Sequence, residues 1–391
     1  MSEETKKAPA IRFQGFTDDW EQRKLGDVYT ERNKRGNDSL KILSVSIHHG
    51  VSNEELDSNT LGKEVRRSED KSLYKHVYLG DLVLNMMRAW QGAVGVVKSE
   101  AMVSPAYITA VPSAELYPLF MDFYLRRDEA IGQMNNLSYG VTDFRKRLYW
   151  DSFVKVLCHI PTVAEQERIT VFFTHLDDTI ALHQRKLTLF NQLKETYLKQ
   201  MFPQNEENMS VLRFADFSEP WEQRKWSETV DISTEMVNPK TGEYDSLPHI
   251  GPGNIESFTG RILDNVKSVK EDNLISGKFH FYPGDVIYGK INPQLGKYAM
   301  VDFEGLASAD SYVLNTKNGV SQTFLFTILQ GTSFYKYSVS VSMRTGMPKI
   351  NRDELNQYSY SAPSVVEQEK IGHFFKQLDG TIALHQRKLT L

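Results

Sequence analysis

The sequence predicts an α+β protein made of two tandem domains of mixed helix and strand, each followed by a long helix. Two observations predict the duplication. The ten residues TIALHQRKLT occur at 179–188 and again at 381–390, and WEQRK occurs at 20–24 and 221–225. A third observation predicts the mixed class: short runs rich in β-branched residues lie between the repeats, separated by Gly, Asn, Asp and Pro. A repeat of such long period dictates the architecture.

The repeats also set the expected boundaries. The predicted order is a disordered tail at 1–10, a first domain at 11–162, a long helix at 163–203, a linker at 204–211, a second domain at 212–363 and a short second helix at 364–391. Each domain is expected to hold one amphipathic helix, LYPLFMDFYLRRDEAIGQM in the first and SQTFLFTILQGTSFYKYS in the second. When the halves are matched, Tyr107 aligns with Tyr312.

The composition is that of an ordinary globular protein, with 40% hydrophobic and 25% charged residues. No apolar run has the length of a signal peptide or a membrane span, which favours a cytoplasmic location. The formal net charge of −4 does not favour a nucleic-acid binder, although a bipolar molecule can still present one basic face. The single Cys158 excludes an internal disulfide framework and a cysteine-cluster zinc site, and we expect it to be a buried structural thiol.

Both long repeats are typical of helices that begin after a proline, Pro161 in the first and Pro363 in the second. Apolar residues then recur at alternating spacings of four and three, which is the pattern of a coiled-coil seam, and Lys194 interrupts it. An antiparallel pair with a domain at each end is the simplest way to hide both seams, and a parallel pair stays open. The predicted seam residues are Ile169, Phe173, Leu176, Ile180, His183, Leu187, Ile371, Phe375, Leu378, Ile382, His385 and Leu389.

No catalytic, cofactor-binding or metal-binding constellation is recognisable. The sequence lacks G-x-G-x-x-G after a strand, H-E-x-x-H, G-x-S-x-G and the [DNS]-P-P-[YFW] motif of amino-methyltransferases. The segment 284–290 has the spacing of a phosphate-binding loop, but it lacks the Ser or Thr that would hold magnesium and is more typical of a strand. His183 and His385 fall on the seam, where a hydrogen-bonded histidine is a better interpretation than a metal ligand.

Two pairs of segments, at matching places in the halves, are candidates for DNA contact. A basic loop with a glycine at 138–147 corresponds to 340–352, and a polar turn at 85–92 corresponds to 289–294. Arg and Lys suit phosphates and guanine, whereas Asn and Gln can bond adenine. A basic loop alone is a weak signal, and its recurrence strengthens it. The candidates are Arg88, Trp90, Gln91, Ser138, Tyr139, Thr142, Arg145, Lys146 and Arg147, and then Lys290, Asn292, Gln294, Ser342, Arg344, Thr345, Lys349 and Arg352.

Taken together, these segments resemble the specificity subunits of type I restriction-modification systems over essentially the whole chain. The resemblance is carried by the paired openings F-x-x-F-x-x-x-W-E-Q-R-K, by Y-x-G-D-L-V-x-N-x-M-R-x-W-Q-G-A-V-G-V at 78–96 and by VSPAY at 103–107. The helix starts IPTVAEQERI and APSVVEQEKI complete it. The combination is specific, although no single piece would be.

The resemblance implies two target-recognition domains, each reading one half of a bipartite, asymmetric double-stranded DNA site, with the paired helices setting the distance between them. It also implies two docked modification subunits, which supply S-adenosylmethionine and methylate adenine at N6. Restriction subunits would add translocation and cleavage that depend on ATP and magnesium. This chain would then hold no cofactor, catalyse nothing and contact no membrane. Its second helix is shorter than the pattern implies.

Two other functions stay open from the residues alone. A self-sufficient DNA methyltransferase or nuclease with unrecognised motifs would modify or cut DNA without partner subunits. A coiled-coil adaptor that does not touch DNA would show no sequence preference in a binding assay done with the modification subunit.

Overall fold

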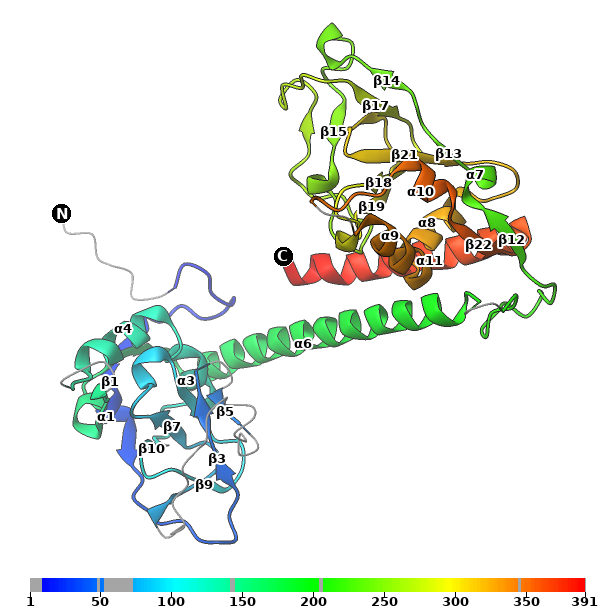
Figure 1. Cartoon of the computed structure of the whole chain (residues 1–391). Coiled ribbons are helices and arrows are strands. Elements are labelled where there is room, and N and C mark those ends of the chain that lie inside the picture. Colours follow the sequence, from blue (N-terminus) through cyan, green and yellow to red (C-terminus); the bar gives the residue numbers. More distant parts are fainter. Residues whose placement is uncertain are drawn as a thin grey trace. The chain divides into compact units, whose positions relative to one another are not determined.

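The structure is a computed structural model, and it describes residues 9–47, 50–52, 73–140, 145–203, 207–343 and 346–390. The chain forms two compact units, which we call unit 1 (Met1–Thr179) and unit 2 (Ile180–Leu391) (Figure 1). Both units mix helices with sheets, and the predicted α+β class is confirmed. Most of the tail predicted at 1–10, and part of the linker predicted at 204–211, lie outside the described residues.

A four-stranded antiparallel sheet lies at the centre of unit 1, in the order β2-β10-β7-β8. Its strands are β2 (Tyr29–Glu31), β7 (Leu82–Asn85), β8 (Val94–Val96) and β10 (Tyr107–Pro112). Alternate side chains of β7 face two different cores, as the period of a strand requires: Leu82 and Leu84 pack with helices, whereas Val83 packs with a second sheet.

That second sheet of unit 1 is mixed, because β3 pairs parallel with β9 and β9 pairs antiparallel with β6. Its strands are β3 (Ile42–Leu43), β6 (Lys75–Val77) and β9 (Ala101–Val103), and a small hairpin joins β4 (Val45–Ser46) to β5 (Gly50–Val51). The helices beside the central sheet are α1 (Leu25–Val28), α3 (Pro118–Tyr124), α4 (Asp128–Leu137) and α5 (Trp150–Phe153).

The prediction of one amphipathic helix per domain was wrong, because each of the two predicted segments forms two helices. In unit 1 the backbone of Arg127 is extended (ψ 146°) between α3 and α4, and Asp128 and Glu129 then begin the second helix. In unit 2 an extended Gly331 separates α8 (Gln322–Gln330) from α9 (Thr332–Ser342). Acidic residues favour a helix N-terminus and glycine disfavours a helix interior, so both breaks have a local cause.

Unit 2 repeats the plan. Its four-stranded sheet has the order β13-β21-β18-β19 and its second sheet the order β14-β17-β20-β15-β16. The first sheet comprises β13 (Val230–Ile232), β18 (Val286–Gly289), β19 (Tyr298–Met300) and β21 (Ser311–Thr316). The second comprises β14 (Met236–Val237), β15 (Pro248–Ile250), β16 (Lys267–Ser268), β17 (Lys278–Phe281) and β20 (Gly305–Ala307). Two short helices, α7 (Trp226–Thr229) and α10 (Arg352–Asn356), correspond to α1 and α5. The strand assigned to 286–289 confirms that 284–290 is not a phosphate-binding loop.

The strand register corrects the alignment of the halves by one residue. Tyr107 pairs with Asn85, and Ser311 pairs with Gly289, so Tyr107 is equivalent to Ser311 and Tyr312 to Ile108. A shift of one residue moves a strand side chain to the opposite face of the sheet. Tyr312 therefore faces the helix-covered core of unit 2, whereas Tyr107 faces the second sheet of unit 1.

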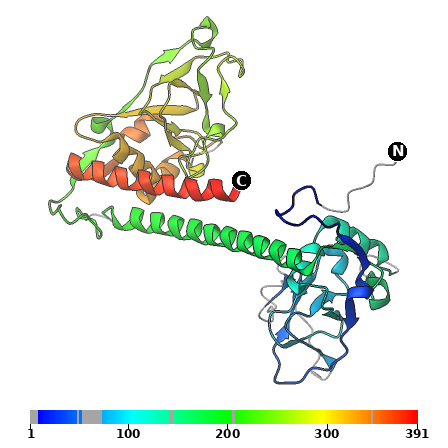
Figure 2. The same ribbon diagram turned by 180° about the vertical axis from the view of Figure 1, so that it is seen from behind.

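Each unit is closed by a pair of edge strands that leads into a long helix. In unit 1, β1 (Glu21–Lys24) pairs with β11 (Leu157–Ile160), and α6 (Val163–Gln200) follows; in unit 2, β12 (Glu222–Lys225) pairs with β22 (Ser359–Ala362), and α11 (Val365–Thr390) follows. Both views show α11, coloured red, lying along the helical side of unit 2 (Figures 1 and 2). None of the helices in the described ranges is long and apolar enough to cross a membrane.

The same contacts lock both helix starts. Arg12 donates two hydrogen bonds of 2.6 Å to the buried Glu165 carboxylate, and Arg213 donates to Glu367 at 2.7 and 2.8 Å. Gln166 bonds the Pro161 carbonyl and the backbone before α3. Gln368 does the same at Pro363 and before α8. The duplicated Glu-Gln pair is therefore a structural clamp at the first turn of each helix.

Within unit 2, α11 and the second half of α6 pack antiparallel, as predicted. Residues with higher numbers in α6 contact residues with lower numbers in α11. His183 Nδ1 lies 2.9 Å from His385 Nδ1, Lys194 bonds Asp379 at 2.7 Å, and the Tyr197 ring meets Phe374 at 5.2 Å between centroids. Lys194, which interrupts the apolar stripe, is thus a mostly buried ion-pair partner. Burial raises the pKa of the Asp379 carboxyl above its usual value, and the Lys194 charge opposes that rise.

The predicted seam needs correction at both ends. Ile371 and Phe375 belong to the core of unit 2, together with side chains of α8, and are not confined to a seam between two helices. In α6, Phe173, Leu176 and Ile180 are exposed by more than a third, and Ile169 packs on the unit 1 core. The seam proper comprises His183, Leu187, Ile382 and His385, with Leu378 and Leu389 partly buried.

Candidate nucleic-acid interface

The two turns predicted to contact DNA occupy equivalent places in the two units. In unit 1, a short 3-10 turn, η2 (Ala89–Gln91), connects β7 to β8, and in unit 2, η6 (Pro293–Leu295) connects β18 to β19. Each turn ends at a glycine in the left-handed region, Gly92 with φ 92° and Gly296 with φ 55°. Glycine adopts this region most readily, so both turns end in the same way. They begin differently, because Arg88 has φ −135° and Asn292 has φ 50°.

In unit 1 the turn and the basic loop lie together. The Leu148 amide donates to the Met86 carbonyl, which fastens the end of the loop to the start of the turn. The Lys146 ammonium lies 5.4 Å from the centre of the Trp90 ring and donates to Asn135. The Trp90 indole donates to the Met87 carbonyl, so the ring is held in place as a platform. The sequence had proposed these segments separately, and the structure joins them.

The remaining unit 1 candidates project around this platform. Arg88, Gln91, Arg145 and Arg147 are exposed. Tyr139 is also exposed, and its ring stacks on Tyr149 at 4.8 Å between centroids. Among the residues that the structure describes, none of the cations Arg88, Arg145, Lys146 and Arg147 forms an ion pair with a carboxylate. They form a cluster of uncompensated positive charge, which we call the unit 1 cation cluster.

Unit 2 has an equivalent cluster built on Tyr312. The Lys290 ammonium and the Arg352 guanidinium lie 5.3 and 5.7 Å from the centre of the Tyr312 ring. Lys349 joins them, because its backbone bridges Ile291 and the next amide, that of Ile350, donates to the Lys290 carbonyl. We call Lys290, Lys349 and Arg352 the unit 2 cation cluster.

The charges of this cluster repel one another. Burial, followed by the positive charges of Lys349 and Arg352, lowers the pKa of Lys290, and Asp310 partly opposes the effect. An anion placed among the three cations would relieve that repulsion, as a DNA phosphate does for clustered Lys and Arg. Arg352 is oriented by donating to the carbonyls of Ile232 and Ser233 at 2.9 and 2.6 Å. It therefore holds the cluster in place as well as contributing charge.

The polar candidates of the unit 2 turn are less free than the sequence suggested. Asn292 adopts the left-handed region with φ 50°, and its backbone N–H donates to the Pro348 carbonyl. The Gln294 side chain approaches Asn292 Oδ1 at 3.4 Å, and its own carbonyl oxygen has no hydrogen-bond partner among the described residues. These amides are positioned at the turn, and the Gln294 carbonyl oxygen is buried.

Five candidates do not join either cluster. Ser138 and Ser342 are buried, and their hydroxyls donate to the carbonyls of Met134 and Val339 in the preceding helices, so they are removed from the candidate set. Thr142, Arg344 and Thr345 lie outside the described residues. The sequence reasoning also missed Tyr312 as the platform of the unit 2 cluster. The predicted alignment of Tyr107 with Tyr312 was wrong by one residue. The correct register places Tyr312 on the same face of the sheet as Lys290.

The other titratable groups singled out by the sequence are structural. Burial raises the pKa of the Cys158 thiol to about 12, so this sulfur is an unreactive core group. Burial, followed by the neighbouring His183, Lys186 and Lys388, lowers the pKa of His385. Within the described ranges, no group of three or more His, Cys, Asp or Glu side chains is arranged to hold a metal ion.

Sequence comparisons find relatives of one kind. The family model described as "Type I restriction modification DNA specificity domain" matches residues 218–391. The chain is 32% identical over 158 residues to the type I restriction enzyme EcoDI specificity subunit of Escherichia coli, covering 40% of this chain and 34% of that protein. It is 31% identical over 155 residues to the HindI specificity subunit of Haemophilus influenzae, covering 36% and 32%. The matches therefore span about a third of the length of these curated relatives.

A solved structure resembles the chain over a greater length. The type I restriction-modification S subunit from M. genitalium aligns with a TM-score of 0.57 and 11% identity, covering 99% of this chain and 95% of that one. At this identity the likeness concerns the fold alone.

Proposed function

Because the chain belongs to the family of type I restriction-modification specificity subunits, we propose that it is the DNA-recognition subunit of such a complex. Unit 1 and unit 2 each read one half of a bipartite, asymmetric double-stranded DNA target. The chain itself catalyses neither methylation nor cleavage. It provides DNA sequence specificity to the subunits that catalyse methylation and cleavage.

One observation carries this proposal from the side of the structure: two clusters of cations occur at equivalent turns of two units. A cluster of Lys and Arg on an aromatic platform, beside amide side chains, suits a phosphate backbone with base edges nearby. The net charge of −4 does not oppose this, because a chain with a negative net charge can still present local groups of cations. The two clusters occupy equivalent turns and differ in side chains, as expected if they contact different half-sites.

The paired helices α6 and α11 set the separation of the two half-sites in this proposal. Two modification subunits dock on the duplicated frame, bring S-adenosylmethionine and methylate adenine at N6. Restriction subunits then use ATP and magnesium for DNA translocation and cleavage. The identical TIALHQRKLT segments support this arrangement, because they offer the same chemical surface twice in one chain.

The test is to read the methylation pattern that the chain imposes. Expressing it with its modification subunit in a strain that lacks other adenine methylation should mark one two-part sequence, which sequencing of the methylome would reveal. Replacing the basic loop and turn of unit 2 should change only one half of that sequence. Marks at random adenines, or a pattern that does not depend on this chain, would contradict the proposal.

The competing enzyme hypothesis is tested with the purified chain alone. We expect no methyl transfer from S-adenosylmethionine and no DNA cleavage without partner subunits. Either activity, retained through further purification, would replace the recognition-subunit proposal by an enzymatic one.

A further inference from the structure

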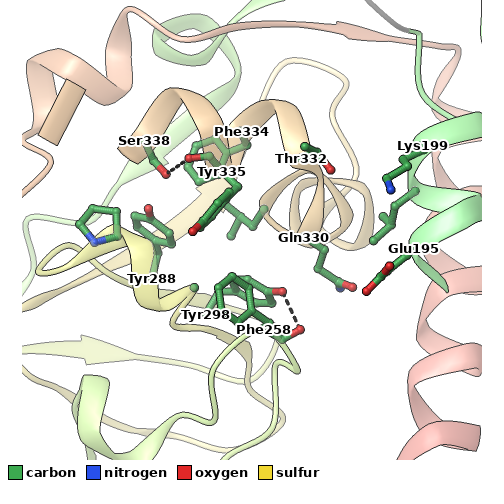
Figure 3. A pocket seen from close by; sticks show the side chains of 14 residues that line it. Glu195, Lys199, Phe258, Tyr288, Tyr298, Gln330, Thr332, Phe334, Tyr335 and Ser338 are labelled. Atoms are coloured by element: carbon green, nitrogen blue, oxygen red, sulfur yellow. Dashed lines mark hydrogen bonds between the residues drawn. The ribbon is translucent and has the colours of Figure 1, made fainter. Parts of the chain in front are cut away.

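Unit 2 contains a cavity of about 320 Å³ between its four-stranded sheet, helix α9 and the end of α6 (Figure 3). Five aromatic side chains form most of its wall, namely Phe258, Tyr288, Tyr298, Phe334 and Tyr335. The volume is at the lower end of the range of about 300–1,000 Å³ that is typical of small-molecule sites. None of the members of the unit 2 cation cluster lines it, although Pro293 and Gly296 of the η6 turn do.

The fold itself does not require this cavity. In unit 1 the positions equivalent to Tyr288 and Tyr298 are Leu84 and Val94, which pair across β7 and β8 as the two tyrosines pair across β18 and β19. The third residue of α9 is Phe334, and the third residue of α4 is Ala130. These unit 1 residues are aliphatic and are buried in the core of that unit. The aromatic lining is therefore particular to unit 2.

The rim of the cavity is held in a strained conformation. Phe258 has φ 64°, a left-handed backbone that a bulky residue rarely adopts, and its ring is half exposed. Its amide donates to the Gly296 carbonyl at 2.8 Å, and its carbonyl accepts from the Tyr298 hydroxyl at 2.9 Å. A Cβ on Gly296 would lie 2.5 Å from the Phe258 ring. Strain that is fixed from several sides is characteristic of ligand sites.

Two ends of the cavity carry different chemistry. At one end the Tyr288 hydroxyl is buried beside Ser338 and makes no hydrogen bond of good geometry with the described residues. Burial raises the pKa of Tyr288 to about 12, so the group is a neutral donor. At the other end lie Glu195 of α6 and Gln330, whose side-chain oxygen also has no partner among the described residues (Figure 3). The cavity thus offers one donor opposite two acceptors.

This pattern fits a flat ring with an acceptor nitrogen and an amino group. Aromatic walls favour a flat π-system in stacked or edge-on contact. The buried Tyr288 hydroxyl calls for an acceptor and the buried Gln330 oxygen for an N–H donor, and the exposed Glu195 carboxylate can accept a second N–H. Of the described lining residues, only Glu195 and Lys199 are charged at neutral pH, and their charges cancel. An ionised phosphate would find no surplus cation there.

We propose that this cavity binds an uncharged amino-substituted purine of nucleoside size. The proposal does not depend on the DNA-recognition function, because it uses residues outside both cation clusters. Phe258 and Tyr335, whose rings meet at 65° with centroids 5.6 Å apart, form the walls nearest the rim. Tyr288 and Gln330 distinguish the edges of the ring.

The test is a titration of the full chain with adenosine, inosine and adenosine monophosphate, followed by calorimetry and ligand-detected NMR. Adenosine should saturate one site. Inosine should bind about tenfold more weakly, because its carbonyl replaces the amino group of adenosine. That carbonyl cannot donate to the oxygens of Gln330 and Glu195. The monophosphate should also bind more weakly than adenosine. Competition by duplex DNA would assign the purine to an extruded base, and its absence would assign it to a free nucleoside.

Phe258→Ala should weaken adenosine binding at least fivefold, because it removes one wall, and its half-exposed position should preserve folding. Tyr288→Phe should weaken the binding of adenosine and of inosine alike, because it removes the donor opposite the amino group and keeps the ring. Ile275→Ala is the control, because Ile275 is 76% exposed and lies outside the cavity. The proposal is overturned if adenosine shows no saturable binding, if inosine binds equally well, or if Phe258→Ala binds like the control.

Discussion

The two units share the contacts at the starts of their long helices but differ in the residues of their turns. At the helix starts, Arg12–Glu165 and Arg213–Glu367 repeat the same bidentate ion pair, and a glutamine repeats the same backbone bonds. At the turns that face outward, the residue after the central strand is Met86 in unit 1 and Lys290 in unit 2. The repeated residues satisfy buried partners within the chain, whereas these changed residues lie at the turns where we propose DNA contact. In these two places, repetition marks the frame and divergence marks the proposed contact surface.

Identical residues of the two repeated helices differ in their solvent exposure. Phe173 in α6 and Phe375 in α11 occupy equivalent places in the repeat, yet Phe173 is 41% exposed and Phe375 is 1% exposed. Phe375 is enclosed by the core of unit 2, whereas the Phe173 ring contacts the Phe123 ring at 5.5 Å between centroids. The same sequence thus gives a buried anchor in one helix and a partly open apolar face in the other. Sequence identity alone does not determine the environment.

The largest effect is expected from breaking the repeated ion pair. Arg213→Met should lower the free energy of unfolding of unit 2 by about 2–3 kcal/mol, because the Glu367 carboxylate, 1% exposed, would be left unpaired. Arg12→Met should destabilise unit 1 in the same direction. Denaturant unfolding followed by hydrogen exchange would separate the two units. If only one variant were destabilised, the two clamps would not be equivalent.

A smaller and pH-dependent effect is expected at the seam. Lys194→Met should cost about 2 kcal/mol at pH 8, because it leaves the buried Asp379 carboxylate without its ion partner. Since burial already raises the pKa of Asp379, removing Lys194 should raise it further. Protonation then neutralises the group, so the variant should recover stability as the pH falls and lose it as the pH rises. Thermal unfolding at pH 5 and pH 8 measures the difference.

The matched control is the double variant Lys194→Met with Asp379→Leu, which removes both charges. It should be more stable than the single variant at pH 8 and should lose the pH dependence. A single variant with equal stability at both pH values would show that Asp379 is not the responsible group.

Lys290→Met converts the unit 2 turn to the residue found in unit 1. We expect about tenfold weaker DNA binding at low salt and a salt dependence reduced by about one counterion, because one phosphate contact is lost. Folding stability should not fall, since repulsion from Lys349 and Arg352 is relieved. Lys240→Met, an exposed cation outside the cluster, is the control. Equal affinity for both variants would remove Lys290 from the contact set.

The smallest effect is expected for Arg145→Ala. The side chain is exposed and has no ion-pair partner within the described ranges, so its loss should leave stability unchanged. We expect DNA affinity to fall by a few fold, and the salt slope to decrease by up to about one. Binding measured at several salt concentrations tests this. An unaltered slope would place Arg145 away from the phosphates.

The sequence predicted those features that repetition or period can reveal. The α+β class, the helix starts after Pro161 and Pro363 and the antiparallel packing of α6 with α11 all follow from spacing and duplication, and they are confirmed. The breaks at Arg127 and Gly331 were missed, because the apolar pattern continues across them. The burial of Ile371 depends on α8, a contact between segments far apart in the chain that no local pattern shows.

The candidate sites were predictable only as segments. Joining the loop at 138–147 to the turn at 85–92 requires the bond between Leu148 and Met86, and recognising Tyr312 requires the strand register. Ser138 and Ser342 looked available because hydroxyls beside glycine and cations suit DNA, but their side chains cap carbonyls of their own helices. A one-residue difference in register or one local hydrogen bond decides such cases.

The contact between His183 and His385 joins a residue to its own counterpart in the repeat, 202 positions away. A hydrogen bond of 2.9 Å between two Nδ1 atoms needs one nitrogen with a proton and one without. Two chemically identical imidazoles therefore differ in protonation at Nδ1, and when both are neutral they are different tautomers. The junction is symmetric in its residues and asymmetric in a single hydrogen, so ¹⁵N spectra of the two rings should show two distinct Nδ1 environments.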